Sequence, residues 1–405
     1  MQEKKHKEHD FSAKLRQASV IDRLKVYIQW RRDQGKTNKE NPLPKFGPLS
    51  INLDLTSACN FACPHCVDSG IINTGEHLDL DTVKASLDTL QSQGLLSVIL
   101  LGGGEPTLHK NFEEIVRYIK GKDLQLGIVT NGTRLGRVEK VSDVLTHKDW
   151  LRISIDAACQ ETFFQSHRPK SGVNLYDILS GAREIKSINP QLSLGYSFVI
   201  VWEGIAAGEH QLYPNISEIP QAVQLAREFG FDYISFKPCL LRLEVNQKES
   251  LFDPPDIERE KKVINDIKLD LAKAKEVAQG QIKILESINL RALLEGKVHE
   301  LKKQPEICHM QFFRTVLSPA GLFHCPAFRG NEKAKISDQR GYLAGAPLQS
   351  TLQNLTRSIT GFDAAKECCV IACFYHHVNW WIEDFIHSDR EVEALETISD
   401  QDFFL

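Results

Sequence analysis

Short β-rich segments alternate with amphipathic helical segments between residues 50 and 240, and this order constrains the fold more than any other feature. Leu80, Val83, Leu87 and Leu90 recur at helical spacing before Gly94, which predicts the first helix. Further helices are predicted at 112–120, 175–188 and 219–229, and strands at 51–55, 97–101, 124–130, 151–155, 192–201 and 233–237. Six right-handed βα repeats predict an α/β fold, a partial (β/α)6 TIM-like barrel whose functional face lies at the carboxyl ends of the strands.

The remaining segments differ in composition. Residues 1–48 are basic and amphipathic and form a predicted helical extension, with Ile21, Leu24, Val26, Tyr27 and Trp30 available for docking. The barrel is assigned to 49–240, and residues 241–304 to a connector rich in Glu, Lys and Leu, in which 255–303 shows no strand pattern. A second set of cysteines defines a C-terminal domain at 305–390, followed by a tail at 391–405.

Composition limits the class of protein. The chain has ten cysteines, but its charged first ten residues do not resemble a signal peptide. The longest apolar run, 95–101, is far shorter than the roughly 20 residues that span a bilayer. The net charge of −4 carries no basic signal for nucleic acid. We therefore expect a cytoplasmic protein without membrane or nucleic-acid partners, whose clustered cysteines bind metal.

Three cysteines lie within eight residues directly after the first predicted strand. Cys59, Cys63 and Cys66 form a CxxxCxxC loop, which leaves a four-coordinate site one ligand short. A structural zinc site normally closes with a fourth protein ligand, whereas an iron-sulfur cluster held by three cysteines keeps one iron open. The spacing favours the cluster.

The motifs that follow successive strands resemble those of the radical S-adenosylmethionine (SAM) superfamily over roughly residues 48–240. The cysteine loop follows the first strand, and Gly102-Gly-Gly-Glu105-Pro106 follows the second. Thr130-Asn131-Gly132 follows the third, and Ser154-Ile-Asp156 ends the fourth. The resemblance implies a 4Fe-4S cluster on the three cysteines whose open iron chelates SAM, giving a 5'-deoxyadenosyl radical that abstracts a hydrogen atom from substrate.

The resemblance also implies roles for single residues in binding SAM. Gly103 and Gly104 would let its methionine moiety approach the backbone, and Glu105 would receive its ammonium group. His65 matches the position near the adenine, although a loop histidine is an alternative. Ser154 and Asp156 would face the ribose, unless Asp156 is a helix N-cap. Asn131 would contact a ligand or make an Asn-Gly turn, and Arg168 would pair with the carboxylate or face solvent.

The C-terminal cysteines resemble, less closely, those of the auxiliary-cluster domains called SPASM and Twitch. A predicted hairpin, Ser318-Pro-Ala-Gly321-Leu-Phe-His-Cys325, has three residues between glycine and cysteine where the family usually has four. The resemblance implies a second 4Fe-4S cluster on Cys308, Cys325, Cys373 and one of two adjacent cysteines, with Cys369 preferred to Cys368. Zinc on the same four thiolates is the alternative.

Three functions follow as hypotheses. The first is a radical SAM enzyme that oxidises or otherwise modifies a carbon centre of a small metabolite or peptide, assisted by the auxiliary cluster and an electron donor such as flavodoxin or ferredoxin. The second is a redox-neutral epimerase in which Cys239, just beyond the sixth strand, donates a hydrogen atom. The third is a non-catalytic iron-sulfur or zinc scaffold. The segment 202–219 is either a substrate lid or a surface loop.

Overall fold

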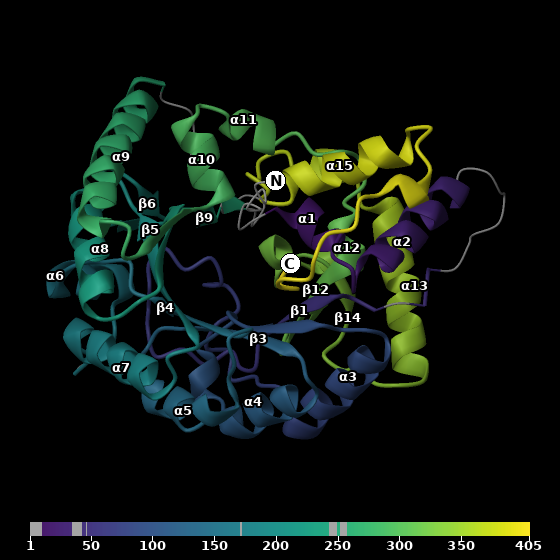
Figure 1. Cartoon of the computed structure of the whole chain (residues 1–405), viewed down its shortest axis with the longest axis horizontal. Helices are drawn as coiled ribbons and strands as arrows, with labels where there is room; N and C mark the ends of the chain where they lie inside the picture. The colour runs from purple at the N-terminus through teal and green to yellow at the C-terminus, as the bar shows by residue number, and fades with distance from the viewer. Residues whose placement is uncertain (1–9, 35–42, 46, 171, 243–248, 252–256) are drawn as a thin grey trace.

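The computed structural model describes residues 10–34, 43–45, 47–170, 172–242, 249–251 and 257–405. Parts of the predicted extension and connector, 1–9, 35–42, 46, 243–248 and 252–256, lie outside the described residues. Figure 1 shows one strongly curved sheet with helices along its outer side.

The sheet has the strand order β11-β8-β5-β4-β3-β2-β1-β12-β13-β14. Its six central strands are β1 (Ser50–Leu53), β2 (Ser97–Leu100), β3 (Gln125–Thr130), β4 (Trp150–Ser154), β5 (Ser193–Ile200) and β8 (Tyr233–Pro238). Each is parallel to its central neighbours. The predicted fold class, a partial α/β barrel followed by a cysteine-rich C-terminal region, is confirmed.

Helices cover the outer face because the strands present alternate residues to the two sides of the sheet. They are α3 (Leu80–Ser92), α4 (Phe112–Gly121), α5 (Leu135–Glu139), α6 (Gln160–His167), α7 (Leu175–Ile188) and α8 (Ile219–Glu228). Ile153 of β4 and Ile178 of α7 both lie against Gly132, so Ile153 points outward. Arg152 and Ser154 alternate with it and therefore point into the barrel, where they are only partly buried.

The connector contains a strand that the sequence analysis missed. It comprises α9 (Ile257–Ala278), β11 (Lys283–Glu286), α10 (Ile288–Leu294) and α11 (Val298–Leu301). β11 pairs in parallel with β8, so the expectation of no strand in 255–303 is wrong. Four residues are too few to show a clear alternating pattern. The strand is stabilised by its pairing with β8, which the local sequence does not reveal.

The C-terminal region continues the barrel sheet past β1. It contains α12 (Met310–Phe313), β12 (Arg314–Ser318), β13 (Gly321–Phe323), β14 (Lys335–Ser337), α13 (Ala346–Gly361), α14 (Ala364–Glu367) and α15 (His376–Ile386). β12 is parallel to β1, and β13 is antiparallel to β12, which makes the hairpin expected before Cys325. The two cysteine-bearing regions therefore share one sheet.

The amino-terminal helices α1 (Phe11–Leu15) and α2 (Ile21–Gln34) pack on this C-terminal region. The Phe11 ring lies 4.9 Å from that of Tyr375, and the Tyr27 ring stacks on Phe312 at 4.7 Å. Of the five residues expected to dock, Val26 is exposed and the other four are buried.

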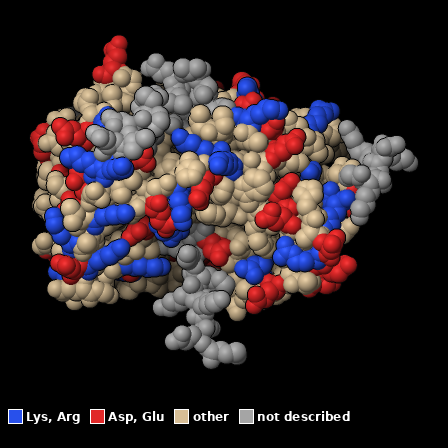
Figure 2. Space-filling model, turned by 90° about the horizontal axis from the view of Figure 1, so that it is seen from above, with Lys and Arg blue, Asp and Glu red and all other residues tan. Residues whose placement is uncertain are grey.

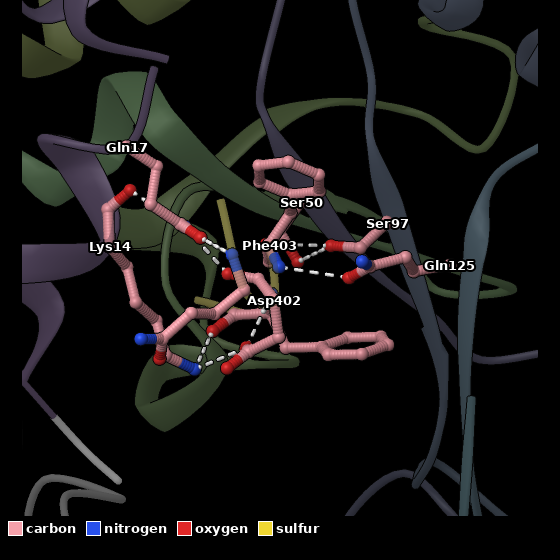
Figure 3. Close-up of polar contacts among 9 residues, drawn as sticks. Lys14, Gln17, Ser50, Ser97, Gln125, Asp402 and Phe403 are labelled. Atoms are coloured by element: carbon pink, nitrogen blue, oxygen red, sulfur yellow. Dashed lines mark hydrogen bonds and ion pairs between the residues drawn. The ribbon is translucent and has the colours of Figure 1, made fainter. Parts of the chain in front are cut away.

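The C-terminal tail lies on the inner face of the barrel, at the amino ends of the strands. The backbone of Phe403 accepts a hydrogen bond from Ser97 at 2.8 Å and donates one to Gln125 at 2.9 Å. Lys14 binds Asp402 at 2.6 Å, which ties α1 to the tail (Figure 3). The Phe404 ring packs edge-on against Trp150, the first residue of β4. The tail thus covers the amino ends of β2, β3 and β4, opposite the expected functional face.

The face shown in Figure 2 carries lysines and arginines interspersed with acidic residues. In the described part of the chain, every helix is too short or too polar to cross a bilayer.

Candidate active site and second cysteine site

The CxxxCxxC loop leaves the carboxyl end of β1 and is held in place by its neighbours. Cys59 N–H donates to Asn73 Oδ1 at 2.8 Å. Cys63 is partly buried, and desolvation, followed by the charges of Cys66 and Cys59, raises the pKa of its thiol well above the usual value. The three thiols therefore lie close enough to repel one another as thiolates, and bound iron would supply the compensating charge.

His167, which the sequence analysis did not assign, touches this loop. Its Nε2–H donates to the Ile155 carbonyl at 2.8 Å, so Nδ1, 3.2 Å from Cys63 Sγ, is the acceptor for the thiol. In the sequence, only the neighbouring Arg168 drew attention to this segment. Arg168 itself ends α6 in the left-handed conformation and makes no ion pair with any described residue.

The glycine turn after β2 packs against the same loop. Gly104 has a φ of +156°, and a Cβ there would overlap the Thr56 and Ala58 carbonyl oxygens. At Gly103, whose φ is +75°, a Cβ would press on Asp54. In this structure the glycines are required for contact of the turn with β1 and the cysteine loop, which is a different reason from the predicted approach of SAM.

Glu105 is buried, and its carboxylate already has protein partners. It accepts hydrogen bonds from Thr107 N–H at 3.0 Å, Thr130 Oγ1 at 2.7 Å and Asn131 N–H at 2.7 Å. Burial raises the pKa of Glu105, and these hydrogen bonds oppose the rise. Asn131 also donates to Asn60 beside Cys59 at 2.8 Å, which links the third strand to the cysteine loop. The Glu105 contact with SAM stays a prediction.

Ser154 and Asp156 do not share a strand face, so the prediction that both side chains point the same way is wrong. β4 ends at Ser154, and Asp156 has a φ of +54°, so the alternation stops between them. Asp156 accepts from Val199 N–H at 2.7 Å and lies 3.5 Å from both His65 and His167. It is not the N-cap of α6, which is Cys159. Burial would raise its pKa, but the hydrogen bond from His65 and the two histidine charges outweigh it and lower the pKa.

A buried ion-pair group joins the cysteine loop to the C-terminal region. Arg329 Nε lies 2.7 Å from Asp54 Oδ2, and its Nη1 lies 2.8 Å from Asp68 Oδ1. Asp54 directly follows β1, Asp68 follows Cys66 by two residues, and Arg329 follows Cys325 by four. Burial raises the pKa of Asp54 to about 7 despite the charge of Arg329. Arg329 lies 261 residues after Asp68 in the sequence, so no local pattern predicted this group.

The second cysteine set surrounds a small, largely apolar cavity. Its lining includes Cys308, Cys325, Cys368, Cys373 and His324. Cys369 is exposed and is not part of the lining, so the structure favours Cys368 over the preferred Cys369. Adjacent residues in this turn point in different directions, which sequence alone could not resolve.

His324 is the unexpected member of this lining. It is 3% exposed, and neither ring nitrogen has a hydrogen-bond partner among the described residues. Burial lowers its pKa to about 3, so the ring is neutral. Four thiols and an unpartnered imidazole around one cavity fit a bound metal group. Among the described residues, however, no three Cys, His, Asp or Glu side chains are arranged around a single ion.

Cys239 and the segment after β5 lie near the mouth of the barrel. Cys239 is fully buried, and burial raises the pKa of its thiol to about 12. The segment 202–219 forms a small hairpin of β6 (Ala206–Ala207) and β7 (His210–Gln211). Asn215 anchors it by donating to the Asp156 carbonyl at 2.8 Å.

The family model named Radical SAM superfamily matches residues 53–200. This match covers the cysteine loop, the glycine turn and β2 to β5, and residues 53–200 are therefore a radical SAM domain, as the resemblance predicted.

Individual relatives match shorter parts of the chain. The S-adenosylmethionine-dependent nucleotide dehydratase of Selenomonas ruminantium is 32% identical over 154 residues, which are 37% of this chain and 56% of that protein. The mycofactocin maturase MftC of Mycolicibacterium smegmatis is 33% identical over 116 residues, 28% of this chain and 29% of that protein. The chain thus spans about half or less of the length of these relatives.

Solved structures match the fold over more of the chain. Streptococcus suis SuiB has a TM-score of 0.56 at 15% identity, over 93% of this chain and 81% of that chain. The structure of native anSMEcpe with bound AdoMet and a peptide has a TM-score of 0.51 at 15% identity, over 79% of this chain and 82% of that chain. The shared fold extends beyond the barrel into the C-terminal region.

Proposed function

We propose that this protein is a radical SAM enzyme that reductively cleaves SAM and abstracts a hydrogen atom from a small metabolite or peptide. The single observation that carries the proposal is the cysteine loop at the carboxyl end of β1, packed through Gly104 against the turn after β2. Cys59, Cys63 and Cys66 would hold a 4Fe-4S cluster with an open iron. Together with SAM, that cluster would supply the 5'-deoxyadenosyl radical.

The residues of the chain would orient the ligand and exclude water. Asp156 and His65 lie together at the mouth of the barrel beside the cysteine loop. The side chain of Ser154, the last residue of β4, points into the barrel on the amino-terminal side of Asp156. The proposed contacts of SAM are with these residues, Gly103, Gly104, Glu105, Asn131 and Arg168. The tail, which covers the amino ends of β2, β3 and β4, would limit access of water from the opposite end of the barrel.

We further propose an auxiliary 4Fe-4S cluster on Cys308, Cys325, Cys368 and Cys373, which would accept an electron during substrate oxidation. The shared cavity of these four cysteines supports it. Zinc at this cavity is the competing assignment. A flavodoxin or ferredoxin would be the electron donor.

The names of the relatives support two kinds of substrate. One relative is named a nucleotide dehydratase, and a SuiB structure holds a precursor peptide. The redox-neutral epimerase is a second candidate, because the raised pKa of Cys239 keeps its thiol in the protonated form that can give a hydrogen atom. Cys239→Ala would then still cleave SAM but release no inverted product, and unchanged product stereochemistry would remove this candidate.

Anaerobic reconstitution tests the main proposal. About eight irons are expected in the intact protein, and about four when Cys59, Cys63 and Cys66 are all alanine. Dithionite-dependent formation of 5'-deoxyadenosine should be lost in that variant and kept in Cys159→Ala, a cysteine outside both sites. Absence of 5'-deoxyadenosine from the intact reduced protein would favour the scaffold hypothesis, and zinc in place of the residual iron would overturn the auxiliary cluster.

A further inference from the structure

Three serines, one from each of three neighbouring strands, lie at one level on the inner face of the barrel. Ser154 of β4 is in register with Ser197 of β5, which is in register with Ser235 of β8. Partners in register on parallel strands point to the same side of a sheet. Within the described part of the chain, none of the three hydroxyls makes a hydrogen bond. None of the three hydroxyl oxygens is completely buried, so each can still be reached by a ligand. The row therefore offers three free donors to the barrel interior.

Two cations flank this row on the same face. Lys237 lies two residues beyond Ser235 on β8 and is only partly buried. Arg152 lies two residues before Ser154 on β4, where its guanidinium packs 4.9 Å from the Trp150 ring and Nε donates to Tyr233 Oη at 3.4 Å. Neither cation forms an ion pair with any residue that the structure describes.

Asp156, the carboxylate whose charge acts on Lys237, does not neutralise these cations. Asp156 is engaged by His65, His167 and the Val199 amide. Burial, together with the charge of Arg152, lowers the pKa of Lys237 to about 7, and Asp156 offsets this only in part. Arg152 and Lys237 lie close enough for the charge of one to disfavour the charge of the other, and an oxyanion bound between them and the hydroxyls would relieve this repulsion.

We propose that the inner face of β4, β5 and β8 binds a phosphate or carboxylate group of the substrate through Lys237, Arg152, Ser197 and Ser235, while Ser154 at the end of the row serves SAM. The inference rests on the proposed function, since it places this group inside the barrel below the SAM site. It narrows the substrate class to molecules that carry an oxyanion several bonds from the carbon that reacts.

Calorimetry with inorganic pyrophosphate and with succinate tests the site on the anaerobically reconstituted protein. Saturable binding of at least one anion is expected, and the anion that binds more tightly indicates whether the group is a phosphate or a carboxylate. Lys237→Met should weaken this binding at least tenfold, Lys237→Arg should retain most of it, and the exposed control Lys268→Met should leave it unchanged. Absence of saturable binding, or equal binding by Lys237→Met when circular dichroism shows a folded protein, would overturn the proposal.

A second titration separates substrate from cofactor. Affinity for S-adenosylhomocysteine should change less than twofold in Lys237→Met. A parallel tenfold loss would mean that Lys237 serves the carboxylate of SAM, and this too would overturn the proposal. Because pyrophosphate binding does not require SAM cleavage, failure to form 5'-deoxyadenosine would count against the proposed function and not against the anion site.

Discussion

At the scale of single residues, the glycine turn makes the sharpest prediction. Gly104→Ala places a Cβ against the Thr56 and Ala58 carbonyls, so we expect a loss of about 2–3 kcal/mol in the free energy of unfolding and less iron on the cysteine loop. Gly121→Ala, with open space around it, is the matched control and should be neutral or slightly stabilising. Urea unfolding and iron analysis measure both, and equal behaviour of the two variants would contradict the assignment.

The buried imidazole at the second cysteine site gives a prediction of opposite sign. In the metal-free protein, His324→Leu removes two unpartnered nitrogens from an apolar cavity, so the free energy of unfolding should rise by about 1–3 kcal/mol. His299→Leu on the surface should change it little. A clear loss of stability in His324→Leu would show that the ring has partners in solution.

The positions of the candidate site residues in the fold were more predictable from the sequence than the contacts that these residues make. The cysteine loop, Glu105 and Ser154 lie at the barrel end that was expected. Asp156 was misplaced because a left-handed residue breaks strand alternation without a sequence signal such as glycine. Cys368 and Cys369 differ only in direction, and that direction depends on how α14 packs.

At the scale of elements, Arg329 follows β13 and forms ion pairs with two distant carboxylates. These are Asp54, directly after β1, and Asp68, directly after the cysteine loop. Arg329→Met leaves Asp54 and Asp68 without their buried cation, and we expect a loss of about 3–5 kcal/mol in the free energy of unfolding. The loop 59–76 should also exchange its amide hydrogens faster. Lys333→Met, which removes an exposed ion pair with Glu367, should cost less than about 1 kcal/mol. If amide exchange in the loop is unchanged in Arg329→Met, the C-terminal region does not hold this loop in place.

The same group predicts a pH dependence. The folded protein raises the pKa of Asp54 to about 7, whereas an unfolded aspartate titrates near 3.9, so the folded state binds this proton more tightly. Its contribution to the free energy of unfolding should therefore fall as pH rises from about 4 to about 7. Asp54→Asn should flatten this part of the stability profile, and Asp143→Asn on the surface should not. If the free energy of unfolding depends on pH in Asp54→Asn as it does in the wild type, another titrating group causes the dependence.

The elements themselves were largely predictable. The six central strands have enough length and apolar content to be recognised from sequence. β11 and the pairing of β12 with β1 were not predicted, since each depends on a partner strand far away in the chain.

At the scale of the whole molecule, the tail connects the amino-terminal helices to the amino ends of β2, β3 and β4. Phe404→Ala removes a buried ring from Trp150, so we expect a loss of about 3–5 kcal/mol in the free energy of unfolding. Phe164→Ala, at a half-exposed ring, is the matched control and should cost less than about 1 kcal/mol. Equal losses in the two variants would show that the tail does not pack there in solution.

The position of β1 between β2 and β12 has a consequence for how the protein can be divided. A fragment that ends after β8 would leave one side of β1 without a hydrogen-bonded neighbour, exposing a template for pairing with other chains. Such a fragment would tend to aggregate even though it contains the whole radical SAM domain. Evolutionary exchange of the C-terminal region would therefore have to preserve a strand beside β1, whatever metal group the new region carried.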